Sequence, residues 1–405
     1  MSKKFHYKKK NSHDLKCDHG LIRIWDVSGD FDKTQLIKLF LPLFKTGFVY
    51  PYISLMPDHH PGKDAMVGSV IPAKEVLMPT LIGGDIGCGV ASVQLPIKLS
   101  DLSPYLNIIY KQLKEAIPTG SSYNSTVTER VQNQPVWQRS LHANLSNRDY
   151  RKLKRQFASL GGGNHFLELQ TDLDDNIWIM LHSGSRYLGV IIRDYYTDAG
   201  RLQEGIDANI YRRVPYLIAG TALAENYLSD VLFAVEFAKA SRHEMMLRTL
   251  EVIATAAPAG SKLDIESLTS KITDVSHNYV AKEKHFDEEL YIHRKGAIRA
   301  NKDERVLIPG SMGTSSFIAS GRGNQFAFCS CSHGAGRNFS RTEAIKKISN
   351  KEFKRSVSNV YHEWDSRLKD EAPAAYKDIN TVMRGQKDLV KIVTELHPML
   401  SIKDV

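Results

Sequence analysis

The chain has 405 residues, of which 42% are hydrophobic and 24% are charged, a composition typical of a globular protein with a substantial buried core. Lys and Arg outnumber Asp and Glu by 54 to 45, so the formal net charge is +9, which favours a polyanion such as nucleic acid over an acidic small molecule as partner. Only four cysteines are present, which excludes a disulfide-based scaffold and is typical of a reducing compartment.

Neither of the two segments that resemble export or membrane signals has the required pattern. Residues 1–10 are basic but lack the apolar core of a signal peptide. Residues 36–56 are the most apolar stretch near the start, but two lysines and two prolines interrupt them. We therefore expect a cytoplasmic protein without membrane contact, in which residues 1–20 form a basic, flexible lead and residues 21–405 form one domain.

The first elements alternate between strand and helix. Residues 22–27 are expected to form a strand, and residues 34–44 an amphipathic helix capped by Asp32 or Thr34. In residues 53–71, two strand-like ends bracket a polar loop that contains His59 and His60. Adjacent side chains of an extended backbone point in opposite directions, so we expect at most one of these histidines to face a common site.

Residues 81–91 place one carboxylate and one thiol, Asp85 and Cys88, among four glycines and between two apolar strands. Glycine in such a context marks a tight turn or a point where a ligand approaches the backbone. In isolation, the motif is more typical of a turn with a buried, inert cysteine.

Residues 101–160 are expected to be mostly helical, and they contain a basic cluster of Arg148, Lys152, Lys154 and Arg155. We interpret this cluster as a solvated helix face. It is followed by the sequence LGGGNHFLE at residues 160–168. Glycines beside an Asn and a His favour a phosphate or metal site over a plain turn.

A continuous apolar run at residues 177–181 predicts a buried strand that delivers His182 and Arg186 at its carboxyl end. In that position His182 is either functional or a structural hydrogen-bonding residue, and Arg186 is suited to an anion. Residues 189–256 are expected to be helical. His277 then follows in a strand-like segment.

The C-terminal third contains two loops of small residues. PGSMGTSS at residues 309–316 can cradle a phosphate but is no Walker A loop. CSCSHGAGR at residues 329–337 lacks the spacing of a zinc site, so we expect a strand that ends at His333 in a glycine-rich turn. A helix is expected after residue 342, a turn at residues 371–378 and a last helix at residues 381–396.

Five of the residues singled out above supply one carboxylate, one thiolate and three imidazoles: Asp85, Cys88, His165, His182 and His277. This set can hold one or two divalent ions, with the thiolate as a bridge. Neighbouring polar side chains at Asn164, Glu168 and Asn278 are candidates to orient the imidazoles. His333 stands apart near two arginines, and a histidine in that setting can act as a covalent nucleophile toward a nucleotide phosphate.

The motifs GGDIGCG, LGGGNHF, HSGSR, HNYV, RKGA, PGSMG, CSCSHGAGR with SRT after it, AYKDI and a late lysine resemble the RtcB RNA ligases, in that order, from about residue 57 to residue 403. The resemblance implies a mixed α+β fold, with sheets surrounded by helices in a single catalytic domain that has a deep pocket. It also implies a GTP- and Mn²⁺-dependent enzyme that joins RNA ending in a 2′,3′-cyclic phosphate or 3′-phosphate to RNA with a 5′-hydroxyl, in tRNA splicing or RNA repair.

The same resemblance assigns residues to roles. It implies that His333 becomes guanylylated, that the guanylate passes to the RNA 3′-phosphate, and that the 5′-hydroxyl then displaces GMP. The implied ligands of two Mn²⁺ ions are Asp85, Cys88, His165, His182 and His277. The implied guanylate pocket contains Asn164, Glu168, Asn278, Ser311, Ser316, Gly336, Tyr376 and Lys403. Positions associated with RNA ends or phosphates are Asp58, Arg186, Lys295, Arg337 and Arg341.

The chain departs from the family pattern in the loop usually written PDVHLGKG, which here is PDHHPGKD, and in GGDIGCG instead of GVDIGCG. The first departure affects the expected RNA end and indicates a paralogue with a dedicated RNA target. Two alternatives stay open: a metal-dependent phosphoesterase that opens cyclic phosphates, and an RNA-binding paralogue that does not ligate. The sequence does not determine the RNA sealed, the oligomeric state or the need for an archease-like helper protein.

Overall fold

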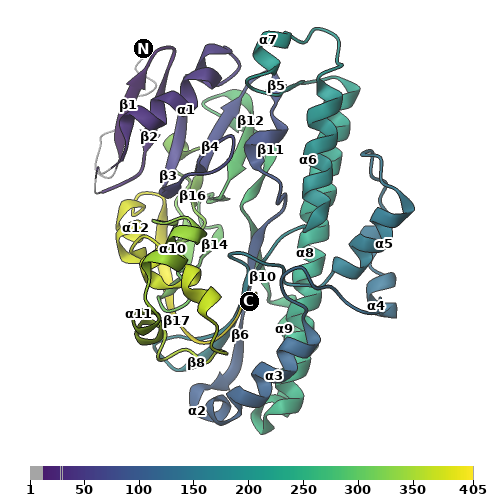
Figure 1. Ribbon diagram of the computed structural model, residues 1–405, viewed down its shortest axis with the longest axis vertical. Coiled ribbons are helices and arrows are strands. Elements are labelled where there is room, and N and C mark those ends of the chain that lie inside the picture. Colours follow the sequence, from purple (N-terminus) through teal and green to yellow (C-terminus); the bar gives the residue numbers. More distant parts are fainter. Residues whose placement is uncertain (1–11, 28, 30, 405) are drawn as a thin grey trace.

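The computed structural model describes residues 12–27, 29 and 31–404, which form two main β-sheets flanked by helices (Figure 1). This mixture of sheets and surrounding helices confirms the α+β class expected from the sequence. Two small two-stranded ribbons complete the strands: β5 (Val76–Leu77) with β9 (Leu217–Ile218), and β13 (Ala297–Arg299) with β16 (Ser330–Ser332).

The first main sheet has the order β1-β2-β3-β4-β12-β11. Its strands are β1 (His13–Cys17), β2 (Gly20–Ile24), β3 (Tyr52–His60), β4 (Val67–Ala73), β12 (Glu288–Lys295) and β11 (Asn278–His285). Strands β2 and β3 are parallel, with α1 between them, and the other pairs are antiparallel.

The second main sheet has the order β10-β6-β8-β7-β17-β15-β14 and is antiparallel throughout. Its strands are β10 (Thr273–Ser276), β6 (Gly89–Lys98), β8 (Asn176–Ser183), β7 (Phe166–Thr171), β17 (Val390–Ile402), β15 (Ser316–Gly321) and β14 (Arg305–Ile308). Strands β10 and β11 belong to different sheets and only His277 separates them, so the chain passes from one sheet to the other at this histidine.

The α-helices lie on the outer faces of the sheets and at their ends. They are α1 (Lys33–Lys45), α2 (Leu99–Leu102), α3 (Leu106–Ala116), α4 (Glu129–Gln132), α5 (Asn147–Gln156), α6 (Tyr187–Gly200), α7 (Ala208–Tyr211), α8 (Ala222–Ala256), α9 (Ile265–Ser270), α10 (Arg341–Lys347), α11 (Asn350–Ser356) and α12 (Ile379–Gly385). Asp32 caps α1 by accepting a hydrogen bond from the Gln35 backbone, as the sequence predicts.

Helix α8 runs along much of the long axis of the molecule (Figure 1) and contacts β6 and β8 of one sheet and β11 of the other. The larger core lies between α8, its neighbours α3 and α6, and the second sheet, with Phe237, Leu113 and Ile179 among its buried side chains. None of the helices in the described part of the chain combines the length and apolar composition needed to cross a bilayer.

The structure corrects three expectations about secondary structure. The predicted helix at residues 381–396 is instead α12 followed by the long strand β17. Apolar residues at 389, 392, 393 and 396 imitate a helical period, but Ile392 and Val393 are exposed, whereas Leu396 and all residues from Met399 to Ile402 are buried. Backbone pairing with β7 on one side and β15 on the other decides the outcome.

The second correction concerns residues 53–71, where Asp58, His59 and His60 lie at the end of β3 and the loop, which contains Lys63, begins only at residue 61. His59 and His60 alternate as expected: His60 lines a cavity described below, whereas the Nδ1 of His59 bonds to the Met56 carbonyl. The third concerns residues 101–160, which are helical only in short pieces.

The predicted N-terminal lead falls partly outside the described residues. Residues 1–11 are not described, but β1 lies within the remainder and pairs with β2. The Asp14 carboxylate of β1 forms an ion pair with the buried Arg23, at 2.9 Å. Residues 13–17 are therefore part of the first sheet, and the boundary at residue 20 stays a prediction.

Candidate functional site

Four segments that are distant in sequence bring the predicted metal ligands together. The Sγ atom of Cys88, just before β6, lies 3.4 Å from the Nε2 of His165 and 3.2 Å from that of His182. The ligand atoms of these three residues lie within 4.8 Å of one another. Asp85 joins the group through an Oδ2–Nε2 distance of 3.1 Å to His165, and His277 through an Nε2–Nε2 distance of 3.3 Å to His182. We call these five residues the Cys–His cluster.

Backbone carbonyls select the tautomer of two of these histidines. The Nδ1 of His165 lies 2.9 Å from the Leu160 carbonyl, and the Nδ1 of His182 lies 3.1 Å from the Asn164 carbonyl. A carbonyl only accepts hydrogen bonds, so each Nδ1 carries a proton, and the Nε2 of His182 presents a lone pair to the cluster. This is the arrangement that orients imidazole ligands in metal sites.

Some polar atoms of the Cys–His cluster have no hydrogen-bond partner in the part of the chain that the structure describes, even within the cluster. Burial, followed by the neighbouring histidines, lowers the pKa of both His182 and His277 well below the usual range, so both rings are neutral. Among the described residues, the buried Asp85 Oδ1 and His277 Nδ1 have no hydrogen-bond partner. Crowded, neutral nitrogens around a thiol and a carboxylate fit a divalent cation, and sulfur with imidazole accepts several first-row metals.

Burial and the nearby Asp85 raise the pKa of the Cys88 thiol well above its ordinary value. A thiolate is the form that binds metal, and metal binding releases the proton. Cys88 is therefore expected to ionise together with cation binding and not before it.

A glycine is required at position 87 for the Cys88 loop to reach this place. Its φ is +76°, and a Cβ there would meet the Val235 Cα at 2.8 Å and the Ala234 carbonyl oxygen at 2.9 Å. The loop is therefore held directly against the backbone of α8.

Arg242, in the middle of α8, fixes the same loop from behind. Its fully buried guanidinium donates from Nη1 to the carbonyls of Gly87, at 2.9 Å, and Ser183, at 2.7 Å, which adjoin Cys88 and His182. It also forms a two-point ion pair with Asp274 of β10. One cation thus ties together the segments that carry Cys88, His182 and His277.

His333 lies at the edge of the cluster, with its ring centroid 4.9 Å from that of His277. Its Nδ1 is 2.6 Å from the Oδ2 of the fully buried Asp58, which also accepts from the backbone N–H groups of His333 and Gly334. Burial alone would raise the pKa of Asp58, but the hydrogen bond from His333 and the nearby Lys377 lower it. Asp58 therefore remains ionised and holds a proton of His333 on Nδ1, so Nε2 is the ring nitrogen that is left for chemistry.

A cavity of about 190 Å³ opens between His333 and the end of β17. His182 and His333 both line it, so the metal candidates and the nucleophile candidate share one space. Six of the eight predicted guanylate residues also line it: Asn164, Glu168, Ser311, Gly336, Tyr376 and Lys403.

The other two predicted guanylate residues lie behind the wall. Asn278 donates to the Asp85 carbonyl, at 3.2 Å, and accepts from the Gly296 N–H, at 2.7 Å. Ser316 is buried and accepts from the Gly310 N–H, at 3.1 Å. Both residues position loops of the site and are not among the residues that line the cavity.

Two buried acids give the cavity wall its polarity. Burial raises the pKa of Glu168, which accepts hydrogen bonds from Gln170 and Ser401. Glu371, in the short 3₁₀ segment Ser366–Glu371, accepts from Lys403 at 2.8 Å and from the Tyr376 hydroxyl at 2.7 Å.

The sequence indicated no role for Glu371 or Arg242. Glu371 lies in a segment that resembles an ordinary turn, and Arg242 lies inside a long helix. Its contacts with Lys403, Tyr376 and Arg337 place this acid on the cavity wall.

The basic residues predicted for RNA ends fall into two groups. Arg337 and Arg341 line the cavity, where Arg337 is paired with Glu371 at 3.1 Å and Arg341 with Asp370 at 2.9 Å. Arg186 and Lys295 approach the cluster from the outside. The Nζ of Lys295 donates to the backbone of the 63–65 loop, and burial lowers its pKa to about 8.

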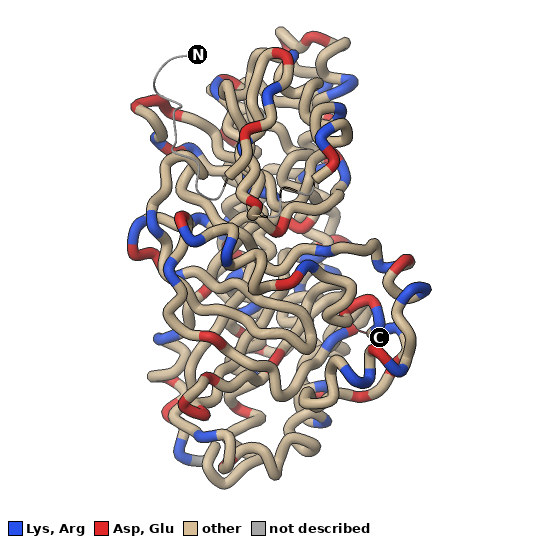
Figure 2. The backbone as a smooth tube through the Cα atoms, turned by 90° about the vertical axis from the view of Figure 1, so that its left-hand side faces the viewer, with Lys and Arg blue, Asp and Glu red and all other residues tan. Residues whose placement is uncertain are grey.

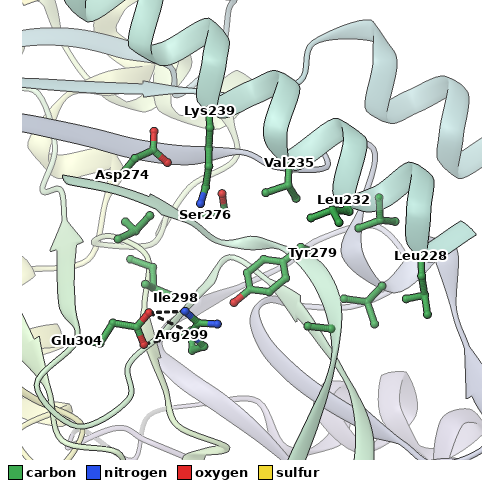
Figure 3. Close-up of a pocket in the computed structure, with 14 residues that line it drawn as sticks. Leu228, Leu232, Val235, Lys239, Asp274, Ser276, Tyr279, Ile298, Arg299 and Glu304 are labelled. Carbon is green, nitrogen blue, oxygen red and sulfur yellow. Dashed lines mark hydrogen bonds and ion pairs between the residues drawn. The ribbon is translucent and has the colours of Figure 1, made fainter. Parts of the chain in front are cut away.

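Two other features carry no comparable chemistry. Cys329 and Cys331 are buried, but neither belongs to the Cys–His grouping found in the described residues. A second cavity, of about 270 Å³, lies between α8 and β11; its walls are largely apolar, with an Arg299–Glu304 ion pair at the rim (Figure 3). No member of the Cys–His cluster lines it.

Comparison with known proteins gives one consistent result. A family model described as tRNA-splicing ligase RtcB matches residues 42–404. The chain is 36% identical to RNA-splicing ligase RtcB of Escherichia coli strain K12, in an alignment that covers 89% of this chain and 91% of the relative. It is 29% identical to RNA-splicing ligase RtcB of Mycobacterium tuberculosis, over 86% and 96%, and 27% identical to tRNA-splicing ligase RtcB of Pyrobaculum aerophilum, over 88% and 88%.

Proposed function

Because the chain belongs to the RtcB family of tRNA-splicing ligases, we propose that it is a GTP- and Mn²⁺-dependent ligase that works through a guanylylated His333 in tRNA splicing or RNA repair. The motif resemblance is thus confirmed at the level of the family: the chain is an RNA ligase, and its substrates are RNA. The proposed ends are a 2′,3′-cyclic phosphate or 3′-phosphate on one RNA and a 5′-hydroxyl on the other.

The observation that carries the proposal is the Asp58–His333 pair on the wall shared with the Cys–His cluster. With its proton held on Nδ1, His333 can attack the α-phosphorus of GTP through Nε2, and the α–β phosphoanhydride bond breaks to release pyrophosphate. A 3′-phosphate oxygen of the RNA then attacks the same phosphorus and breaks its bond to Nε2. Finally the 5′-hydroxyl attacks the activated 3′-phosphate, and GMP leaves.

The Cys–His cluster fits the two Mn²⁺ ions that the family resemblance implies. Asp85, Cys88, His165, His182 and His277 would hold them, and the chemistry that such cations supply is stabilisation of charge on the attacking and leaving oxygens. Within the chain, the Leu160 and Asn164 carbonyls keep the imidazoles in the binding tautomer, and Arg242 keeps the loops in register.

The guanylate is proposed to occupy the cavity beside His333. Glu168 and Lys403 offer an acceptor and a donor to the base. Glycine is required at position 336, because φ is +74° and a Cβ there would meet the Asp58 carbonyl oxygen at 2.1 Å. Arg186, Arg337, Arg341 and Lys295 remain the candidates for the RNA phosphates, whereas we assign Asp58 to the orientation of His333.

The alternative functions differ in their dependence on His333. A metal-dependent phosphoesterase would need the Cys–His cluster but no histidine with an acid behind it, and an RNA-binding paralogue would need neither. The buried Asp58–His333 pair favours the ligase.

The test is incubation with Mn²⁺ and α-labelled GTP. Wild type is expected to retain the label, and His333→Ala is expected to lose it. His285→Ala is a matched control, because His285 is also buried and also paired with a carboxylate, Glu283, at 2.9 Å, but does not line the cavity. Absence of label on wild type with Mn²⁺ and with other divalent metals would refute the proposal.

A further inference from the structure

Helix α5 carries a row of cations that the proposed mechanism does not use. Their positions, i, i+3, i+4 and i+7, place them on one side of the helix. Leu153 and Gln156 are buried on another side. We call the row the α5 basic face; it consists of Arg148, Arg151, Lys152 and Arg155.

This face differs from an ordinary solvated helix surface, because its cations form no ion pair with an acid of the described residues. Lys, Arg, Asp and Glu are interspersed over the side of the molecule drawn in Figure 2, as is normal for a soluble surface. Within residues 12–27, 29 and 31–404, however, no ion pair involves a member of the α5 basic face. The one acid of the helix, Asp149, is occupied by the capping box with Ser146.

Two tyrosines flank the α5 basic face. The Nζ of Lys152 lies 3.6 Å from the centroid of the Tyr187 ring, and the guanidinium carbon of Arg155 lies 4.4 Å from that of Tyr123. Tyr123 is 41% exposed. Cations interleaved with accessible aromatic rings are the combination that binds single-stranded nucleic acid, since the cations follow the phosphates and the rings stack on bases.

The face is continuous with the Cys–His cluster. The backbone N–H of Tyr187 donates to the Oε1 of Gln156 on α5, at 3.4 Å. The preceding residue, Arg186, packs on Gly161, where an added Cβ would overlap its guanidinium and lie 2.6 Å from the Nδ1 of His165. The Nη2 of Arg186 donates to the Gly120 carbonyl at 2.6 Å, and among the described residues its buried Nε has no hydrogen-bond partner, so this guanidinium keeps unused donor capacity beside the cluster.

We propose that the α5 basic face binds the sugar–phosphate backbone of the single-stranded RNA behind the end that is being joined. Tyr123 and Tyr187 stack on its bases, and Arg186 receives a phosphate nearer the end. The inference rests on the proposed ligase function and extends it to the part of the substrate outside the cavity. At 1.5 Å per residue, α5 is about 15 Å long, enough to contact several nucleotides.

The test compares two triple variants that lose the same charge. Arg148→Gln/Arg151→Gln/Lys152→Gln removes three of the four charges of the α5 basic face. Its control neutralises three exposed lysines of α1, far along the chain from the site: Lys33→Gln/Lys38→Gln/Lys45→Gln. The probe is a fluorescent single-stranded RNA of about 20 nucleotides with a 3′-phosphate, long enough to reach from the cavity to the α5 basic face. Its binding is followed by anisotropy over a range of salt concentrations.

The α5 variant is expected to bind this RNA at least about tenfold more weakly, and the slope of log Kd against log salt should fall by about 2, which is 0.7 for each of three lost phosphate contacts. The α1 variant should match wild type. A trinucleotide with the same 3′-phosphate should bind wild type and the α5 variant alike, because it ends inside the cavity.

Equal affinities and salt slopes for the α5 and α1 variants would overturn the inference and leave the ligase proposal intact. If wild type bound neither RNA nor GTP, the ligase proposal itself would be refuted instead. Thermal unfolding checks that the variants fold. Should the α5 variant unfold, RNA that contains 4-thiouridine is crosslinked to wild type instead. Crosslinks in peptides that contain Tyr123 or Tyr187 support the inference, and crosslinks confined to other peptides contradict it.

Discussion

Two buried histidine–carboxylate pairs in this protein look alike, but only one of them places a histidine where it can act as a nucleophile. His333 bonds through Nδ1 to Asp58, at 2.6 Å, and His285 bonds through Nε2 to Glu283, at 2.9 Å. The other nitrogen of His285 is also occupied, by the Oε1 of Gln325 at 3.1 Å. His333 lines the cavity with its Nε2 uncommitted to a protein partner in the described structure, so access and a free lone pair, and not the pairing itself, distinguish a nucleophile from a structural histidine.

The acids of the two pairs differ as well. Glu283 is neutralised by the fully buried Arg294, with which it shares two hydrogen bonds. Within the described part of the chain, Asp58 has no such guanidinium partner and accepts instead from His333 and two backbone N–H groups. The charge of Asp58 is therefore directed at the imidazole, whereas that of Glu283 is shared.

The largest expected effect is a difference in guanylylation rate between variants that neutralise the acid of one pair or of the other. Asp58→Asn should reduce the rate of His333 guanylylation by about 10²–10⁴-fold, since an amide can hold the imidazole in the wrong tautomer. Glu283→Gln should leave the rate within about twofold while destabilising the fold. Quenched-flow labelling with α-labelled GTP measures both, and equal losses in the two variants would show that the pairs do not differ as described.

The second effect concerns Arg242, whose guanidinium is as buried as that of Arg294 but contacts the loops of the Cys–His cluster. Arg242→Met should destabilise the protein by about 3–5 kcal/mol, because Asp274 loses its partner, and weaken Mn²⁺ binding by about 10–100-fold. Arg242→Met/Asp274→Leu should recover much of the stability but not the affinity. Calorimetric Mn²⁺ titration together with denaturant unfolding checks this, and recovery of both would reduce Arg242 to a packing role.

The third effect is a pH dependence of stability that belongs to the structural pair. Burial raises the pKa of Glu283, but Arg294 and His285 outweigh this effect and lower the pKa to about 2. A depressed carboxyl pKa stabilises the folded state above the unfolded value and loses that contribution as pH falls through the folded value. Wild type should therefore exceed Glu283→Gln in unfolding free energy by about 3 kcal/mol at pH 6, and the gap should close between about pH 4.5 and pH 2. A gap that is constant with pH would contradict the shift.

The smallest effect distinguishes buried cysteines. Mn²⁺ at about 100 times its Kd should stabilise wild type by about 2.7 kcal/mol, and Cys88→Ala should lose this gain, together with metal content. Cys331→Ala, which removes an equally buried thiol outside the cluster, should retain it. Thermal unfolding with and without Mn²⁺, followed by metal analysis, measures the difference. Normal metal content in Cys88→Ala would exclude Cys88 as a ligand.

Much of the site was predictable from sequence because its residues lie where the chain is constrained. Cys88, His165 and His182 each adjoin glycines or a strand end, and their ligand atoms do converge. Their roles as metal ligands, like those of the nucleotide and RNA residues, stay predictions. Arg242 and Glu371 could not be found, because a buried arginine in a helix and an acid in a turn acquire meaning only through contacts distant in sequence.

The fold was predictable in class but not in its last part. Residues 381–396 satisfy a helical period as well as a strand period, and short apolar runs of this kind are ambiguous. Pairing with β7 and β15, which come from distant parts of the chain, decides in favour of a strand. The same dependence on partners explains why His59 and His60 lie in a strand and not in a loop.

The place of β17 has a consequence for protein synthesis. This late strand is inserted between β7 and β15 and leads directly to Lys403 on the cavity wall. A nascent chain synthesised only as far as residue 380 can carry all five residues of the Cys–His cluster and His333, yet it lacks the strand that joins the two halves of its sheet. Such a chain exposes the unpaired edges of β7 and β15 to chaperones or to aggregation. It cannot yet close its cavity around a nucleotide, so ligase activity is expected to begin only after release of this segment from the ribosome.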